Sequence, residues 1–86
     1  MSRYSVGFTA AAARAIRKLP KNVRTRLLDA IEGLGDDPRP NGSRKLSGTD
    51  VAWRIRIGDH RMIYEIEDDL LLVTVVRATH RREVYR

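Results

Sequence analysis

The sequence contains no cysteine, so neither a disulfide framework nor a cysteine-ligated zinc site can form. Histidine is also scarce. His60 and His80 lie far apart in the sequence and lack the spacing of a metal-binding motif. We therefore expect the chain to use neither a metal ion nor any other cofactor.

The 86-residue sequence also lacks a long apolar run, at its N-terminus or elsewhere. This absence argues against a signal peptide and against a membrane-spanning helix. The length fits a single domain, spanning residues 1–86, with a modest hydrophobic core. We expect a cytoplasmic location.

Acidic residues are outnumbered by basic ones, at 11 against 17, which gives a formal net charge of +6. Fourteen of the basic residues are arginine, whose guanidinium group binds phosphate in a bidentate manner and stacks on bases. This composition favours a polyanionic partner, most simply a nucleic acid. The alternatives are a basic surface that is only solvated and a basic surface that binds an acidic protein.

The most informative stretch is 51–67, whose alternation predicts a β-hairpin. Apolar side chains alternate with Arg54 and Arg56 before the turn and with Arg61 after it, and Gly58 suits the tight turn between the strands. If the apolar side chains of both strands face one core, the three arginines must share the opposite face. They would repel one another there unless an anion binds.

The rest of the chain predicts a small α+β domain. The expected elements are a strand at 4–8, helices at 10–19 and 22–34, a loop at 35–48 and an apolar strand at 70–78. The predicted order is β-α-α-β-β-β, a small antiparallel sheet with an N-terminal helical hairpin packed on one face. By its phase in the last strand, His80 is expected on the open face with the arginines.

Several motifs together resemble a known family. They are KLP at 18–20, DPRPNGSRKLSG at 37–48, WRIRIGDHRMIYEI at 53–66 and HRREVYR at 80–86. In this combination the chain resembles, over nearly its whole length, toxins of the RelE/ParE superfamily, the toxic half of bacterial type II toxin–antitoxin modules. The resemblance implies a RelE-like fold and a cognate antitoxin, RelB-like, acidic and folding on binding.

The superfamily has two activities on one fold, so the fold alone does not choose between them. RelE-like members enter the A site of the 70S ribosome and cut mRNA, whereas ParE-like members poison DNA gyrase. We favour the RelE-like activity, because the basic residues together with a terminal histidine and tyrosine suit RNA cleavage. A relic that binds only its antitoxin is a third possibility.

The favoured activity is that of a metal-independent endoribonuclease. The 2′-OH attacks the neighbouring phosphate and leaves a 2′,3′-cyclic phosphate, so the protein must stabilise charge on the phosphoryl oxygens and move two protons. Arg61 falls on the catalytic arginine of the family. Arg54 and Arg56 fall where RelE-like nucleases often carry lysine, and arginine in practice cannot serve as a general base.

Proton transfer is therefore assigned to His80 or to Tyr85, which matches the C-terminal tyrosine of the family. The expected catalytic residues are Arg54, Arg61, His80 and Tyr85. The expected RNA-binding residues are Arg44, Lys45, Arg56, Arg81 and Arg82. In the competing interpretations, His80 is a packing residue and Arg61 pairs with Glu65 or Glu83. Trp53 and Tyr64 are expected in the core.

Overall fold

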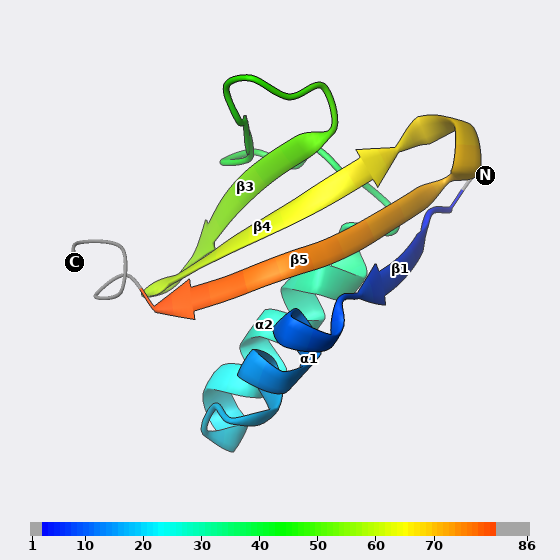
Figure 1. The fold of residues 1–86 in the computed structure, drawn as a ribbon. Coiled ribbons are helices and arrows are strands. Elements are labelled where there is room, and N and C mark those ends of the chain that lie inside the picture. Colours follow the sequence, from blue (N-terminus) through cyan, green and yellow to red (C-terminus); the bar gives the residue numbers. More distant parts are fainter. Residues whose placement is uncertain (1–2, 81–86) are drawn as a thin grey trace.

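The structure, a computed structural model, describes residues 3–80 of the chain. Its elements are β1 (Ser5–Phe8), α1 (Ala10–Arg17), α2 (Lys21–Gly33), β2 (Arg44–Lys45), β3 (Ala52–Ile57), β4 (His60–Glu67), a short 3-10 helix η1 (Asp68–Leu70) and β5 (Leu72–His80). The two helices form a hairpin on one side of a single sheet (Figure 1). In the described part of the chain, no helix is both long and apolar enough to cross a membrane.

The first helix begins where the sequence supplies a cap. Thr9 has an extended backbone, and its Oγ1 accepts a hydrogen bond from the backbone N–H of Ala12 at 3.2 Å. This satisfies one of the N–H groups that have no partner in the first turn of a helix. Helix α1 ends at Arg17, and Pro20 precedes the first residue of α2, where its missing N–H does no harm.

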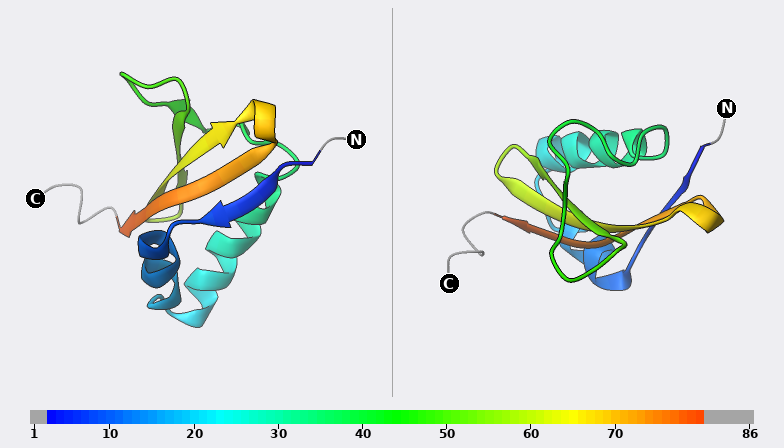
Figure 2. Two further views of the ribbon diagram at one scale, coloured as in Figure 1. Left: turned by 45° about the vertical axis from the view of Figure 1, so that its right-hand side comes forward. Right: turned by 90° about the horizontal axis from the view of Figure 1, so that it is seen from above.

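The sheet has five strands in the order β1-β5-β4-β3-β2 and is strongly twisted (Figure 2). Neighbouring strands run antiparallel except for β1, which lies parallel to β5. The sheet is therefore mixed, whereas the sequence analysis predicted an antiparallel sheet. The segment predicted as a loop also contributes the two-residue strand β2, which pairs with β3 at one edge of the sheet.

The central hairpin of β3 and β4 is present as predicted. Arg56 lies opposite Arg61, and Arg54 lies opposite Ile63. Directly opposed residues of an antiparallel pair share a face of the sheet, so the three predicted arginines do lie on one face. The turn uses Gly58 at φ +60°, a conformation that suits glycine because it has no Cβ.

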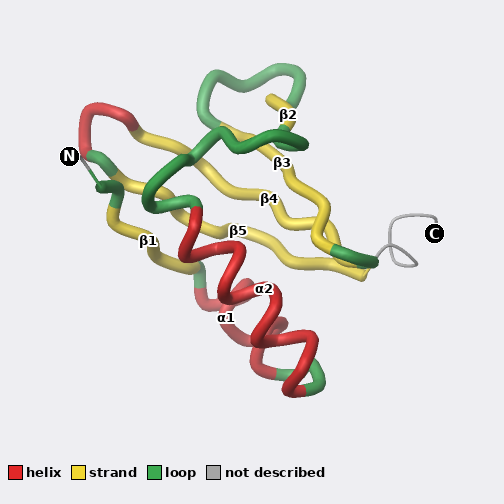
Figure 3. The backbone as a smooth tube through the Cα atoms, turned by 180° about the vertical axis from the view of Figure 1, so that it is seen from behind, coloured by secondary structure: helices red, strands yellow, loops and turns green. Residues whose placement is uncertain are grey.

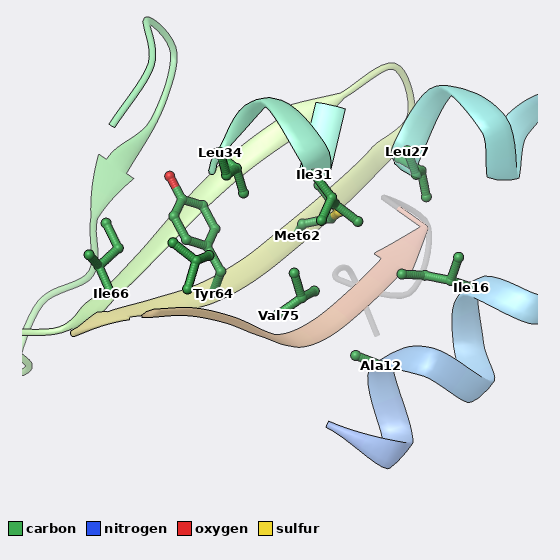
Figure 4. Packing of buried hydrophobic residues seen from close by; sticks show 10 residues of the cluster. Ala12, Ile16, Leu27, Ile31, Leu34, Met62, Tyr64, Ile66 and Val75 are labelled. Atoms are coloured by element: carbon green, nitrogen blue, oxygen red, sulfur yellow. The ribbon is translucent and has the colours of Figure 1, made fainter. Parts of the chain in front are cut away.

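The helices cover the other face of the sheet, which is seen from behind in Figure 3. There the core is built from helix residues such as Ile16 and Ile31 and from sheet residues such as Met62 and Tyr64, all nearly or fully buried (Figure 4). Trp53 packs against this cluster and is partly buried. The prediction that Trp53 and Tyr64 belong to the core is confirmed.

A β-bulge in β5 changes which residues face the helices. Tyr64 pairs with Val75 and Ile63 pairs with Arg77, so Val76 is an extra residue without a partner in β4. An extra residue reverses the alternation of side chains beyond it. His80 consequently pairs with His60 on the helix-facing side. The expectation that His80 shares a face with the arginines is wrong, because it assumed an unbroken alternation through the strand.

Candidate functional site

The open face of the sheet carries five arginines, which we call the arginine face: Arg44, Arg54, Arg56, Arg61 and Arg77. They come from four neighbouring strands, β2 to β5. The face of the sheet away from the helices is the one turned towards the viewer in Figure 1. Strand pairing sets their positions, because Arg44 is opposite Arg54 and Arg56 is opposite Arg61. The arginines that were predicted to converge are therefore positioned by the paired strands of the sheet.

Part of the arginine face is hollowed. A pocket of about 250 Å³ is lined by Gly42, Arg44, Arg54, Ile55, Arg56 and Arg61. This volume is below the range of about 300–1,000 Å³ that is typical of sites for whole small molecules. The pocket therefore fits one charged part of a larger molecule, such as a phosphate of a nucleic-acid backbone.

The arginine face has no acidic partner among residues 3–80. The ion pairs of that region lie elsewhere and involve Arg3, Arg39 and Lys45. Two like charges about 4 Å apart repel by about 1 kcal/mol even in water, and by more where solvent is excluded. A bound polyanion would remove this repulsion. Arg61 and Glu65 form no ion pair, and Glu83 lies outside the described residues.

A second arginine site has the opposite character. The guanidinium of Arg39 binds both carboxylate oxygens of Asp68, at 2.9 and 3.3 Å, and lies 5.3 Å from the centre of the Trp53 ring. Tyr4 also donates to Asp68, at 2.6 Å. The hydrogen bonds from Arg39 and then from Tyr4 lower the pKa of Asp68, and the bond to Asp68 raises the pKa of Tyr4. With its charge already paired, Arg39 has a structural role.

The other predicted site residues are not brought to the arginine face. Lys45 pairs with Trp53, on the opposite side of the sheet from Arg44, and its Nζ lies 3.8 Å from an oxygen of Asp50. Arg81, Arg82 and Tyr85 lie outside the described residues.

His80 lines clefts beside the helical hairpin, where its ring meets that of His60 edge-on with centroids 5.1 Å apart. His80 therefore lies on the side of the sheet away from the hollow. Histidine, cysteine and carboxylate side chains of residues 3–80 form no cluster of three or more that could hold a metal ion.

Arg77 is the member of the arginine face that the sequence analysis missed. Strict alternation through 70–78 would place it on the buried side with Val73 and Val75. A signal was nevertheless present. Arg77 is the one charged residue of that apolar run, and a buried unpaired arginine is costly. The conflict between charge and phase could have indicated a bulge before Arg77.

Comparison with known proteins assigns the family. Residues 6–85 match the family model described as the ParE toxin of the type II toxin–antitoxin system, parDE. Among curated proteins, Toxin RelG of Mycobacterium tuberculosis is 34% identical, with 96% of this chain and 97% of that protein covered.

Solved structures agree with this assignment. The toxin–antitoxin complex RelBE2 of Mycobacterium tuberculosis contains a chain with a TM-score of 0.81 and 29% identity, with 94% of both chains covered. The archaeal RelE–RelB complex of Pyrococcus horikoshii gives a TM-score of 0.83 and 27% identity, with 92% of this chain and 96% of that chain covered. The chain thus belongs to the RelE/ParE superfamily, the toxins of type II toxin–antitoxin modules.

Proposed function

We propose that this toxin is a RelE-like endoribonuclease that cuts mRNA in the A site of the 70S ribosome and so inhibits translation. The observation that carries the proposal is the hollow of the arginine face, in which four arginines converge without an acidic partner among residues 3–80. Such a hollow suits the phosphate at which RNA is cut. A site on the ribosome also implies that the protein acts in the cytoplasm.

In the proposed reaction the 2′-oxygen of a nucleotide attacks its own 3′-phosphorus. The bond from phosphorus to the 5′-oxygen of the next nucleotide breaks, which leaves a 2′,3′-cyclic phosphate and a 5′-OH. Negative charge builds up on the phosphoryl oxygens, and Arg54 and Arg61, with Arg56 beside them, are the groups that would stabilise it. Arg61, directly opposite Arg56, is the central residue of this set.

Two protons must also move, one from the 2′-OH and one to the leaving 5′-oxygen. The arginines stay charged and cannot accept a proton. His80 is on the other side of the sheet from the hollow, so we do not propose it for this task. Tyr85 remains the proposed proton-transfer residue. Arg81 and Arg82 remain proposed phosphate contacts, and Arg44 is a contact at the rim of the hollow. Lys45 is not part of the proposed cleavage site, because it lies on the side of the sheet opposite to the arginine face.

The partner we propose is a RelB-like antitoxin, in line with the RelE–RelB complex among the solved neighbours. An acidic segment that folds on this chain would neutralise the arginine face. The main alternative is a DNA gyrase inhibitor without nuclease activity, and one observation favours it: the matching family model carries the ParE name.

The test is primer extension on a defined mRNA, either free or programmed into ribosomes, with the wild-type protein and with Arg61→Ala. We expect codon-phased cuts on ribosomes only, and none with the variant. Arg17→Ala, an exposed change on α1, is the matched control and should leave the cuts in place. Growth arrest without cuts, together with accumulation of cleaved DNA–gyrase complex, would instead support the gyrase inhibitor.

A further inference from the structure

Arg77 occupies a part of the arginine face that the hollow does not include. It pairs with Ile63 of β4, whose neighbour on the other side, in β3, is Arg54. Ile63 thus lies between Arg54 in β3 and Arg77 in β5. These two strands flank β4 and are about 10 Å apart, which is two interstrand spacings. The hollow lies on one side of Ile63, and Arg77 lies on the other.

The bulge at Val76 is what turns Arg77 outward. Beyond the bulge Ala78 packs against the core, and it lines a cleft together with residues of α1. Because successive side chains of a strand point to opposite faces, Arg77 points away from the helices. Its side chain is exposed.

The position of Arg77 adds to the repulsion on this face. Thr79 lies opposite Arg61, so Arg77 is the diagonal neighbour of Arg61, at a distance of about 7–8 Å between the Cα atoms. Arg77 takes part in no ion pair within residues 3–80, with Glu65 or with any other carboxylate. An exposed arginine beside other unpaired arginines contributes little to the fold. It is well placed to meet an anion.

We infer that Arg77 is a further RNA-contacting residue, which binds the phosphate of a nucleotide adjacent to the cleaved one, on the far side of Ile63 from the hollow. The inference rests on the proposed function, in which the arginine face binds RNA. In this role Arg77 strengthens binding and does not touch the reacting atoms. The face then holds the RNA strand at two points, which fixes its direction across the sheet.

The first experiment measures binding of a short single-stranded RNA whose 2′-oxygens are methylated, so that it cannot be cut, at several salt concentrations. Arg77→Ala should weaken binding by about tenfold at low salt, as expected for one lost charge-assisted contact. It should also lower the slope of log K against log salt by about 0.7. Arg77→Lys should keep most of the slope. The control Arg17→Ala should change neither quantity.

The second experiment uses programmed ribosomes and separates Arg77 from the catalytic residues. Arg77→Ala should raise the toxin concentration that gives half-maximal cleavage and leave the rate at saturation unchanged, whereas Arg61→Ala should lower that rate. A lower saturating rate in Arg77→Ala would mean that Arg77 acts on the chemical step, against the inference.

The outcomes also distinguish this inference from the proposed function. If Arg77→Ala binds RNA as the wild type does while Arg61→Ala binds more weakly, the role of Arg77 is overturned and the nuclease proposal stands. If the wild-type protein neither binds RNA nor cuts it on ribosomes, the proposed function fails, and the inference fails with it. Thermal unfolding of each variant shows whether a loss of binding comes from misfolding. If Arg77→Ala misfolds, the salt slope of Arg77→Lys is the test, and the inference expects most of that slope to be kept.

Discussion

The arginines of this chain differ in their surroundings. This difference distinguishes arginines that stabilise the fold from arginines that are available to bind a ligand. Arg39 is bound to Asp68 and stacked on Trp53, so its charge is used within the fold. Arg61 lies on the open face, lines the hollow and has no acidic partner among residues 3–80. Substitutions at the two positions should therefore affect different properties.

Removing the guanidinium of Arg61 should strongly lower activity and spare the fold. We expect Arg61→Ala to lower the cleavage rate on ribosomes by about 10²–10³, which is typical for the loss of one group that stabilises transition-state charge. The free energy of unfolding should change by no more than about 0.5 kcal/mol, because the side chain makes no ion pair in residues 3–80. Cleavage assays and urea unfolding measure the two quantities.

The reverse pattern is expected at Arg39. Arg39→Ala breaks the contacts with Asp68 and Trp53 and should lower the melting temperature. Cleavage per folded molecule should be unchanged. A loss of cleavage in Arg39→Ala at full stability would contradict the division of roles between the two arginines.

The Asp68 carboxylate should make stability depend on pH in the acidic range. Its pKa in the folded protein is lowered, first by the hydrogen bond from Arg39 and then by that from Tyr4. A lowered folded-state pKa contributes stability that is present above the unfolded-state pKa, near 3.9, and is lost as the pH falls through the folded-state value. Asp68→Asn should be less stable than the wild type at neutral pH, and the difference should shrink in acid. Urea unfolding across this pH range tests the prediction.

The hairpin and the two helices were predictable, because their hydrophobic residues recur with the period of a strand or a helix. The alternation in 51–67 predicted the hairpin and the common face of Arg54, Arg56 and Arg61, because a shift by one residue would have buried the arginines. The 3.6-residue spacing gave both helices. The parallel pairing of β1 was not predictable from a four-residue strand, since no local pattern encodes the direction of its partner.

The bulge in β5 explains the wrong placement of His80. The run 70–78 is apolar at nearly every position and shows no alternation, so an extra residue such as Val76 leaves no mark in its hydrophobic pattern. Only the charge of Arg77 conflicts with its expected phase. Beyond the bulge, each side chain faces the side opposite to the expected one. This is why His80 was assigned to the open face and Arg77 was not.

A buried hydrogen bond helps to hold the long segment between α2 and β3 against the core. The hydroxyl of Tyr64 donates to the backbone oxygen of Pro38 at 2.8 Å, and burial raises the pKa of this hydroxyl, which keeps it protonated as a donor. Tyr64→Phe keeps the ring in the core but leaves the Pro38 oxygen without this donor. We expect a loss of about 1–3 kcal/mol in the free energy of unfolding. An unchanged urea midpoint would show that the bond contributes nothing to stability.

At the scale of the whole molecule, the two faces of the sheet have separate tasks. The helix-covered face holds the core, and the open face presents positive charge. Lowering the positive charge of the open face should relieve repulsion and cost little stability. A domain this small buries little apolar surface, so the loss of core contacts should lower its stability much more. Under the proposed function, an acidic antitoxin segment would inhibit the toxin by neutralising the arginine face.

A pair of substitutions tests this separation. Ile31→Ala removes buried atoms of α2 and should cost about 2–5 kcal/mol in the free energy of unfolding, enough to unfold much of a marginally stable domain. Arg54→Ala on the open face should leave the melting temperature unchanged or slightly raised and should weaken cleavage. The opposite ranking of the two melting temperatures would contradict the assignment of the faces.

We propose that the arginine face promotes attack by a 2′-OH on the neighbouring phosphate of mRNA. The most direct measurement uses ribosomes programmed with an mRNA that carries a single 2′-deoxy nucleotide at the position cut in the A site. Wild-type toxin should cut the all-ribose mRNA to give a 2′,3′-cyclic phosphate and a 5′-OH, and should leave the substituted mRNA intact at that position. Cleavage of the deoxy-substituted mRNA at the same bond, or a product with a 5′-phosphate, would contradict this mechanism.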